Sequence, residues 1–191
     1  KSVVLLKNAG DILPLRDLRS LYVLGPTAAS AEVLMGNYYG FSDSLTTLIE
    51  GIVARTPEGV RFEYRPGTLL LHVPANPSTW TTMAAARSDV VIACMGLSPQ
   101  MEGEEGDAIE SPANGDRTEI GLPAVQTDYL RELKANGSRI VLVLTGGSAI
   151  ALGDVADLAD AILFVWYPGQ EGGSAVAGTL GATLPLILMG L

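Results

Sequence analysis

Four short apolar runs constrain the fold of this chain most strongly, because each of them ends at a polar loop that contains glycine. They are residues 21–24, 90–95, 140–144 and 161–166. Nearly continuous hydrophobicity over such short lengths is typical of strands that are buried on both faces of a parallel sheet. A shorter stretch of alternating character, residues 61–64, predicts a fifth strand.

Helical patterns lie between these runs. The clearest runs from Pro123 to Asn136 and stops before Gly137, and proline in the first turn with glycine after the last turn is typical of helices. Further helices are predicted over residues 44–55, 78–88, 154–159 and 173–180. Strands that alternate with helices predict an α/β fold, with a mainly parallel β-sheet sandwiched by helices. We expect residues 1–191 to form a single domain.

Composition excludes several classes of partner. A hydrophobic content of 48% supplies a core, and the net charge of −9 with no basic patch argues against nucleic acid. No run reaches the roughly 18 to 20 apolar residues of a membrane span, so we expect no membrane partner. Residues 1–7 do not form a signal peptide. A secreted or periplasmic location of the full-length protein stays open.

The residues that usually bind metals or cofactors are scarce. Cys94, the single cysteine, lies in an apolar run, so we expect a buried strand residue and not a nucleophile. His72 has no second histidine or cysteine nearby, which argues against a metal site. Neither G-x-G-x-x-G nor G-x-x-x-x-G-K-[ST] occurs, so we expect no nucleotide and no other cofactor. Ser148 lacks a nearby histidine that would make it a nucleophile.

The loop over residues 96–118 is the main candidate for chemistry. It holds six carboxylates and one cation, Arg117, and it follows an apolar run, at the end of a strand where parallel sheets bind ligands. Crowded carboxyl groups raise one another's pKa, and a carboxyl with a raised pKa can act as a general acid near neutral pH. A solvated acidic loop and a cation site are the alternatives, although the calcium-loop spacing is missing.

Several segments together resemble one family, glycoside hydrolase family 3, which contains β-glucosidases and β-xylosidases. They are residues 1–8 with 12–15, the M-G-N-Y-Y-G stretch 35–40, residues 96–105 with 115–118, the L-P-A-V-Q stretch 122–126, and the W-Y-P-G-Q-E-G-G stretch 166–173. The resemblance spans nearly the whole chain. It departs near the end, where residues 178–185 keep only the Leu-Pro of the family's usual G-R-L-P.

The resemblance implies a retaining hydrolase that cleaves O-glycosyl bonds of β-glucosides or β-xylosides, such as small saccharides and aryl or alkyl β-glycosides. In the family, an aspartate of an N-terminal (β/α)8 barrel is the nucleophile, and a C-terminal α/β sandwich usually supplies the acid/base glutamate. This chain resembles the sandwich. We therefore expect a fragment of a two-domain enzyme that is inactive without its barrel. The alternative is a non-catalytic sugar-binding or interaction module of the same fold.

The resemblance also implies the site residues. Many members carry the acid/base as G-E followed by aspartate three residues on, and residues 103–107 place Glu104 at that position. Glu105 is the runner-up and Glu102 is third.

Four further residues are implied in supporting roles. Asp116 and Arg117 are expected to order the acidic loop by ion pairing and hydrogen bonds. Tyr38 and Tyr39 are expected to line the sugar site or pack the domain interface. We expect Trp166 to belong to the core at the end of its strand.

Overall fold

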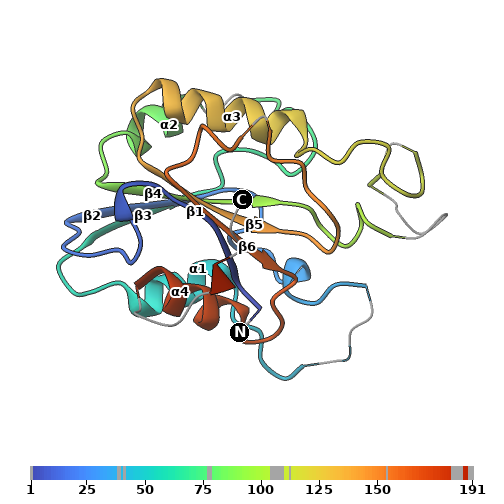
Figure 1. Ribbon diagram of the computed structural model, residues 1–191, viewed down its shortest axis with the longest axis horizontal. Coiled ribbons are helices and arrows are strands. Elements are labelled where there is room, and N and C mark those ends of the chain that lie inside the picture. The colour runs from blue at the N-terminus through green and yellow to red at the C-terminus, as the bar shows by residue number, and fades with distance from the viewer. Residues whose placement is uncertain are drawn as a thin grey trace.

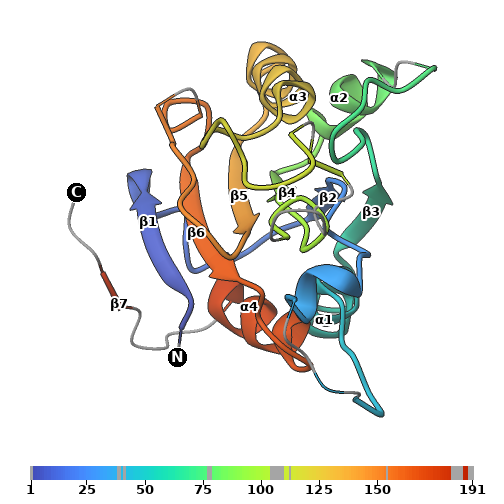
Figure 2. The same cartoon turned by 90° about the vertical axis from the view of Figure 1, so that its right-hand side faces the viewer.

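The computed structural model describes residues 2–37, 40, 42–76, 79–103, 110–111, 113–153, 155–181 and 187–188. Its centre is a seven-stranded sheet in the order β3-β2-β4-β5-β6-β1-β7 (Figures 1 and 2). The parallel part consists of β2 (Ser20–Leu24), β3 (Arg61–Arg65), β4 (Val90–Gly96), β5 (Ile140–Thr145) and β6 (Ala161–Trp166). β1 (Val4–Asn8) pairs antiparallel with β6, and β7 (Ile187–Leu188) pairs parallel with β1.

Helices cover both faces of the sheet. Figure 1 shows α2 (Thr79–Ala85) and α3 (Ala124–Ala135) on one face, with α1 (Leu48–Arg55) and α4 (Gly172–Gly181) on the other. Two short 3₁₀ helices, Ala9–Asp11 and Glu32–Leu34, lie in the connections. The predicted fold class, a mainly parallel sheet sandwiched by helices, is confirmed.

The alternation of side chains along β4 explains the continuous hydrophobicity of its sequence. Val90, Ile92 and Cys94 pack in the cluster that includes α1 and α4, whereas Val91 and Ala93 pack in the cluster that includes α3. Every residue of β4 is buried. Because helices cover both faces of the sheet, neither face of this strand is in contact with water.

The five strand predictions are confirmed to within one residue at each end, and the predicted 123–136 and 173–180 helices correspond to α3 and α4. The helix predicted over 44–55 begins later, at Leu48, because Thr47 caps it in a capping box with Glu50. The helix predicted over 154–159 is wrong. Its described residues form turns, because the N–H groups of Val155 and Ala156 both donate to the Leu152 carbonyl and do not continue the regular hydrogen-bond series of an α-helix.

Among the described residues, none of the helices has the length and apolar character that crossing a bilayer would require. The parallel arrangement brings the ends of β4, β5 and β6 to one edge of the sheet. At that edge Gly96 has φ of +133°, and a β-carbon on it would lie 2.1 Å from the carbonyl oxygen of Thr145. Glycine is therefore required where the acidic loop leaves β4.

Candidate active site at the carboxyl ends of the strands

Gln126 of α3 fixes the point at which the acidic loop begins. Its side-chain oxygen accepts a hydrogen bond from the Gly96 N–H at 2.8 Å, and its amide nitrogen donates to the Gly96 carbonyl at 2.8 Å. The same nitrogen donates to the Leu70 carbonyl at 2.7 Å. Gln126 is fully buried and pairs with Gly96 as the backbone of a neighbouring strand would. The loops after β3 and β4 are therefore both tied to α3.

Glu102 joins the loops that follow β4, β5 and β6. Its carboxylate accepts hydrogen bonds from the backbone N–H of Gly147 at 2.7 Å and of Ser148 at 3.0 Å. It also accepts from the hydroxyls of Ser148 and Tyr167. The Glu102 side chain is only 7% exposed. We call Glu102, Gly147, Ser148 and Tyr167 the Glu102 anchor.

Tyr167 takes part in the Glu102 anchor as a proton donor. Burial of its hydroxyl raises the pKa of Tyr167 above its ordinary value, and the hydrogen bond to the negatively charged Glu102 raises it further. The phenol therefore stays protonated, as donation to a carboxylate requires. A β-carbon on Gly147 would lie 3.0 Å from the Tyr167 ring, so the glycine leaves the room that the ring occupies.

Arg117 binds the far end of the acidic loop to the same structure. Its guanidinium donates to the Glu119 carbonyl at 3.2 Å and to the Ala149 carbonyl at 2.7 Å. It also donates to the Ser148 hydroxyl at 2.8 Å and lies 4.0 Å from a carboxylate oxygen of Glu102. The buried negative charge of Glu102 thus has a positive partner, which offsets part of the cost of removing it from water.

The described structure covers some of the predicted site residues and not others. Glu104, Glu105, Tyr38 and Tyr39 lie outside the described residues. Asp116 is exposed, and its side chain makes no hydrogen bond or ion pair with any described residue. Its predicted role in ordering the loop stays a prediction.

Trp166 is not a core residue, so that prediction is wrong. Its side chain is 41% exposed, its indole N–H donates to the Ser2 carbonyl at 2.9 Å, and its ring stacks edge-on against Phe164. The pairing of β5 with β6 shifts between Leu144 and Thr145. This bulge, together with the left-handed φ of 61° at Trp166, turns the ring out of the buried layer.

Cys94 is fully buried within β4, as predicted, and burial raises the pKa of its thiol to about 12. His72 is exposed. Within the described ranges, no three histidine, cysteine, aspartate or glutamate side chains come together in a way that could hold a metal ion.

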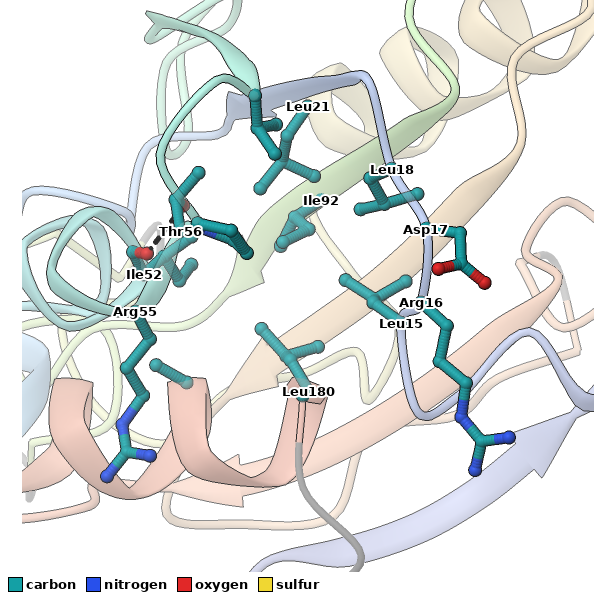
Figure 3. Close-up of a pocket in the computed structure, with 14 residues that line it drawn as sticks. Leu15, Arg16, Asp17, Leu18, Leu21, Ile52, Arg55, Thr56, Ile92 and Leu180 are labelled. Atoms are coloured by element: carbon teal, nitrogen blue, oxygen red, sulfur yellow. Dashed lines mark hydrogen bonds between the residues drawn. The ribbon is translucent and has the colours of Figure 1, made fainter.

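Two hollows differ in their chemistry. One of about 280 Å³ opens beside the Glu102 anchor and is lined by Glu102, Asp116, Arg117 and Ser148, so charged groups face it. The other, of about 170 Å³, lies between α1, α4 and the segment before β2, with largely apolar walls (Figure 3). The first lies where the strand ends meet and could hold a polar ligand.

Sequence reasoning did not identify Gln126, Ser148 or Tyr167 as parts of this site. A signal for Gln126 exists in the sequence, because it lies three, four and seven residues before Tyr129, Leu130 and Leu133, on the buried face of α3. A polar residue on an apolar helix face indicates a buried hydrogen-bond partner. No comparable local signal distinguishes Ser148 or Tyr167.

The amino-acid sequence is similar to that of a known family of enzymes. The family model described as "Glycosyl hydrolase family 3 C-terminal domain" matches residues 3–185. A periplasmic beta-glucosidase of Salmonella typhimurium is 33% identical over 94% of this chain and 25% of its own length. A xylan 1,4-beta-xylosidase of Xylanibacter ruminicola is 52% identical over 47% of this chain and 11% of its own length.

Solved structures agree with the sequence comparisons. A GH3 exo-beta-xylosidase in complex with a xylobiose aziridine activity-based probe superposes with a TM-score of 0.78 at 30% identity, over 94% of this chain and 22% of that one. The chain thus spans about a quarter, or less, of the length of these relatives.

Proposed function

Because this chain belongs to the glycosyl hydrolase family 3 C-terminal domain family, we propose that it acts as one domain of a longer, retaining β-glycosidase. The protein would hydrolyse O-glycosyl bonds of β-glucosides or β-xylosides, and this domain would supply the general acid/base. The Glu102 anchor carries the proposal, since it holds Glu102, in the first part of the acidic loop, at the edge of the sheet where parallel α/β folds bind ligands. Glu104 follows two residues later in the chain.

Glu104 would act twice in a double displacement. As an acid it protonates the leaving-group oxygen while a carboxylate nucleophile attacks the anomeric carbon, and as a base it then takes a proton from the water that releases the sugar. Retention of configuration requires the two carboxyl groups to lie about 5 to 5.5 Å apart. The nucleophile would belong to an N-terminal (β/α)8 barrel, so the isolated chain is expected to be inactive.

Relatives guide the choice of substrate. Their names include a beta-glucosidase and a xylan 1,4-beta-xylosidase, which supports small β-linked saccharides and aryl or alkyl β-glycosides as substrates. No nucleic acid is expected, given the net charge of −9.

Substitution of Glu104 in the full-length protein tests the proposal. Glu104→Gln should reduce turnover of aryl β-glycosides with poor leaving groups by about 100- to 10,000-fold, the usual contribution of general acid–base catalysis. On an aryl β-glycoside with a good leaving group, azide should restore turnover and give a β-glycosyl azide, because azide attacks the glycosyl-enzyme intermediate without needing a general base. Glu105→Gln, which removes the neighbouring charge, should remain active.

The opposite result would reassign the acid/base. If Glu104→Gln keeps wild-type rates while Glu105→Gln loses activity and responds to azide, Glu105 takes the role. If the wild-type full-length protein binds xylo- or gluco-oligosaccharides but turns none over, the domain belongs to a sugar-binding module.

A further inference from the structure

We propose that Glu102 is a positioning residue whose carboxylate, through the Glu102 anchor, holds the proton-transferring residue of the acidic loop in its working place. The inference rests on the proposed function, since it concerns the same loop. Glu102 is the third acid/base candidate from the sequence, and its contacts argue for this different role. Its two carboxylate oxygens accept four hydrogen bonds from the loops after β5 and β6.

The donors to Glu102 lie directly after two central strands of the sheet. Gly147 and Ser148 follow Gly146, which is buried directly after β5, and their N–H groups are part of the backbone. The Tyr167 hydroxyl is carried by the residue that follows β6. A carboxylate bound at several points by groups of this kind has little freedom to move.

The anchor also reaches the segment before Tyr38 and Tyr39. The Asn37 side chain donates to the backbone carbonyl of Glu102 at 3.3 Å. The Gly169 N–H donates to the Leu34 carbonyl at 2.7 Å, which ties the same segment to the loop after β6. Glu102 therefore contacts three other segments of the carboxyl edge.

A charged side chain at this nearly buried position destabilises the fold unless hydrogen bonds or a cation stabilise the charge. Removing a carboxylate from water costs free energy that hydrogen bonds and a nearby cation must offset, and Arg117 lies 4.0 Å away for this purpose. A neutral side chain of similar size would fill the same space. What the charge adds is a set of strong, directional hydrogen bonds that fix the backbone of the loop.

Glu104 follows Glu102 by two residues in the chain, so the position of Glu102 limits where Glu104 can lie. Two residues of extended chain span at most about 7 Å, so a fixed Glu102 limits how far from the Glu102 anchor Glu104 can lie. In enzymes, misplacing a reacting group by about 1 Å can reduce the rate about 100-fold. The inference therefore predicts a catalytic loss without loss of a reacting group.

The test compares Glu102→Gln with Glu119→Gln in the full-length protein. Glu119 lies close to Arg117 in sequence and is exposed, and its side chain makes no hydrogen bond within the described part of the chain, so its substitution is a matched control. Glu102→Gln should lower kcat about 100-fold on aryl β-glycosides with poor leaving groups, with KM within a few-fold of wild type. Azide should give no glycosyl azide, because the acid/base carboxyl is still present. Glu119→Gln should match wild type.

Other outcomes separate the possible failures. Wild-type kinetics of Glu102→Gln in an active enzyme would overturn the positioning role and leave the proposed function standing. A glycosyl azide formed by Glu102→Gln would make Glu102 itself the acid/base. Absence of turnover in the wild-type full-length protein would overturn the proposed function, and this inference with it.

A milder variant covers the case in which Glu102→Gln does not fold. Tyr167→Phe removes one donor to Glu102 and keeps the ring that packs against Gly147. It should lower kcat about 10-fold, a part of the loss expected for a misplaced group, and leave the pH dependence of kcat/KM unchanged. If Tyr167→Phe is as active as wild type, the anchor does not position the loop.

Discussion

Gly51 of α1 and Gly173 of α4 let the two helices meet backbone against backbone. A β-carbon on Gly51 would lie 2.1 Å from the carbonyl carbon of Gly173, and one on Gly173 would lie 1.9 Å from the carbonyl oxygen of Thr47. The Gly173 N–H also donates to the Thr46 carbonyl at 2.9 Å. The start of α4 is thereby fixed against the start of α1, and with it the loop that carries Tyr167.

Replacing Gly173 by alanine should destabilise the protein. Alanine ordinarily favours a helix by up to about 1 kcal/mol over glycine, but here its methyl group collides with the backbone of α1, and overpacking costs about 1–3 kcal/mol or more. Urea unfolding should give a lower midpoint for Gly173→Ala. Gly153→Ala is the control, since no atom lies within 4 Å of its β-carbon. Equal stability of the two variants would contradict the close approach of the helices.

Replacing Gln126 by methionine should be costly although the two side chains have similar size. The change leaves the Gly96 N–H, the Gly96 carbonyl and the Leu70 carbonyl without their buried partner. Unpaired buried polar groups cost about 1–3 kcal/mol each, so the two buried Gly96 groups alone should lower the free energy of unfolding by at least about 2 kcal/mol. Gln170→Met, at an exposed position where the side chain accepts one hydrogen bond from Ser42, should change it by less than about 1 kcal/mol. A Gln126→Met variant as stable as Gln170→Met would show that these bonds are dispensable.

The stability of the protein should fall as the pH rises above 10. Burial raises the pKa of Tyr129 from 10.0 to about 12, and its hydroxyl is hydrogen-bonded to Thr81. Between these pH values the unfolded chain loses the Tyr129 proton and the folded chain keeps it, so the unfolded state is favoured. Each unit of pKa difference is worth about 1.4 kcal/mol, and the loss should approach about 2–3 kcal/mol at pH 12.

Unfolding of Tyr129→Phe, measured across the same pH range, isolates this effect from the other tyrosines. The difference in unfolding free energy between wild type and variant should be constant below pH 10 and shift in favour of the variant above it. A difference that stays constant up to pH 12 would mean that Tyr129 titrates normally in the folded protein.

The strands buried on both faces and the alternating strand β3 could be predicted from the sequence, whereas β1 and β7 could not. β4 is apolar at nearly every position because helices cover both of its faces. β1 ends in Lys7 and Asn8 and is only partly buried. Its sequence is therefore as typical of the start of a loop as of a strand. Lys7 donates to the Ala156 carbonyl, a partner 149 residues away that no local pattern can indicate.

The sequence predicts where the candidate site lies, but not its contacts. The length and acidity of the loop after β4 made it the main candidate for chemistry. The role of Glu102 depends on Gly147 and Ser148, 45 and 46 residues away, and on Tyr167, 65 residues away. Two of its donors are backbone N–H groups, which every residue but proline has, so residue type could not reveal them.

The direction of β1 decides how a preceding domain would meet this edge. Because β1 runs opposite to β6, and Ser2 accepts a hydrogen bond from the Trp166 indole, the chain enters the sheet beside the strand ends that carry the acidic loop. A domain joined ahead of Ser2 would be tethered at that edge, where short linkers give effective concentrations in the millimolar range. If the two domains of such an enzyme were produced separately, each would have to reach a similar concentration for the mixture to match the activity of the linked protein. This would not hold if the two domains bound each other tightly.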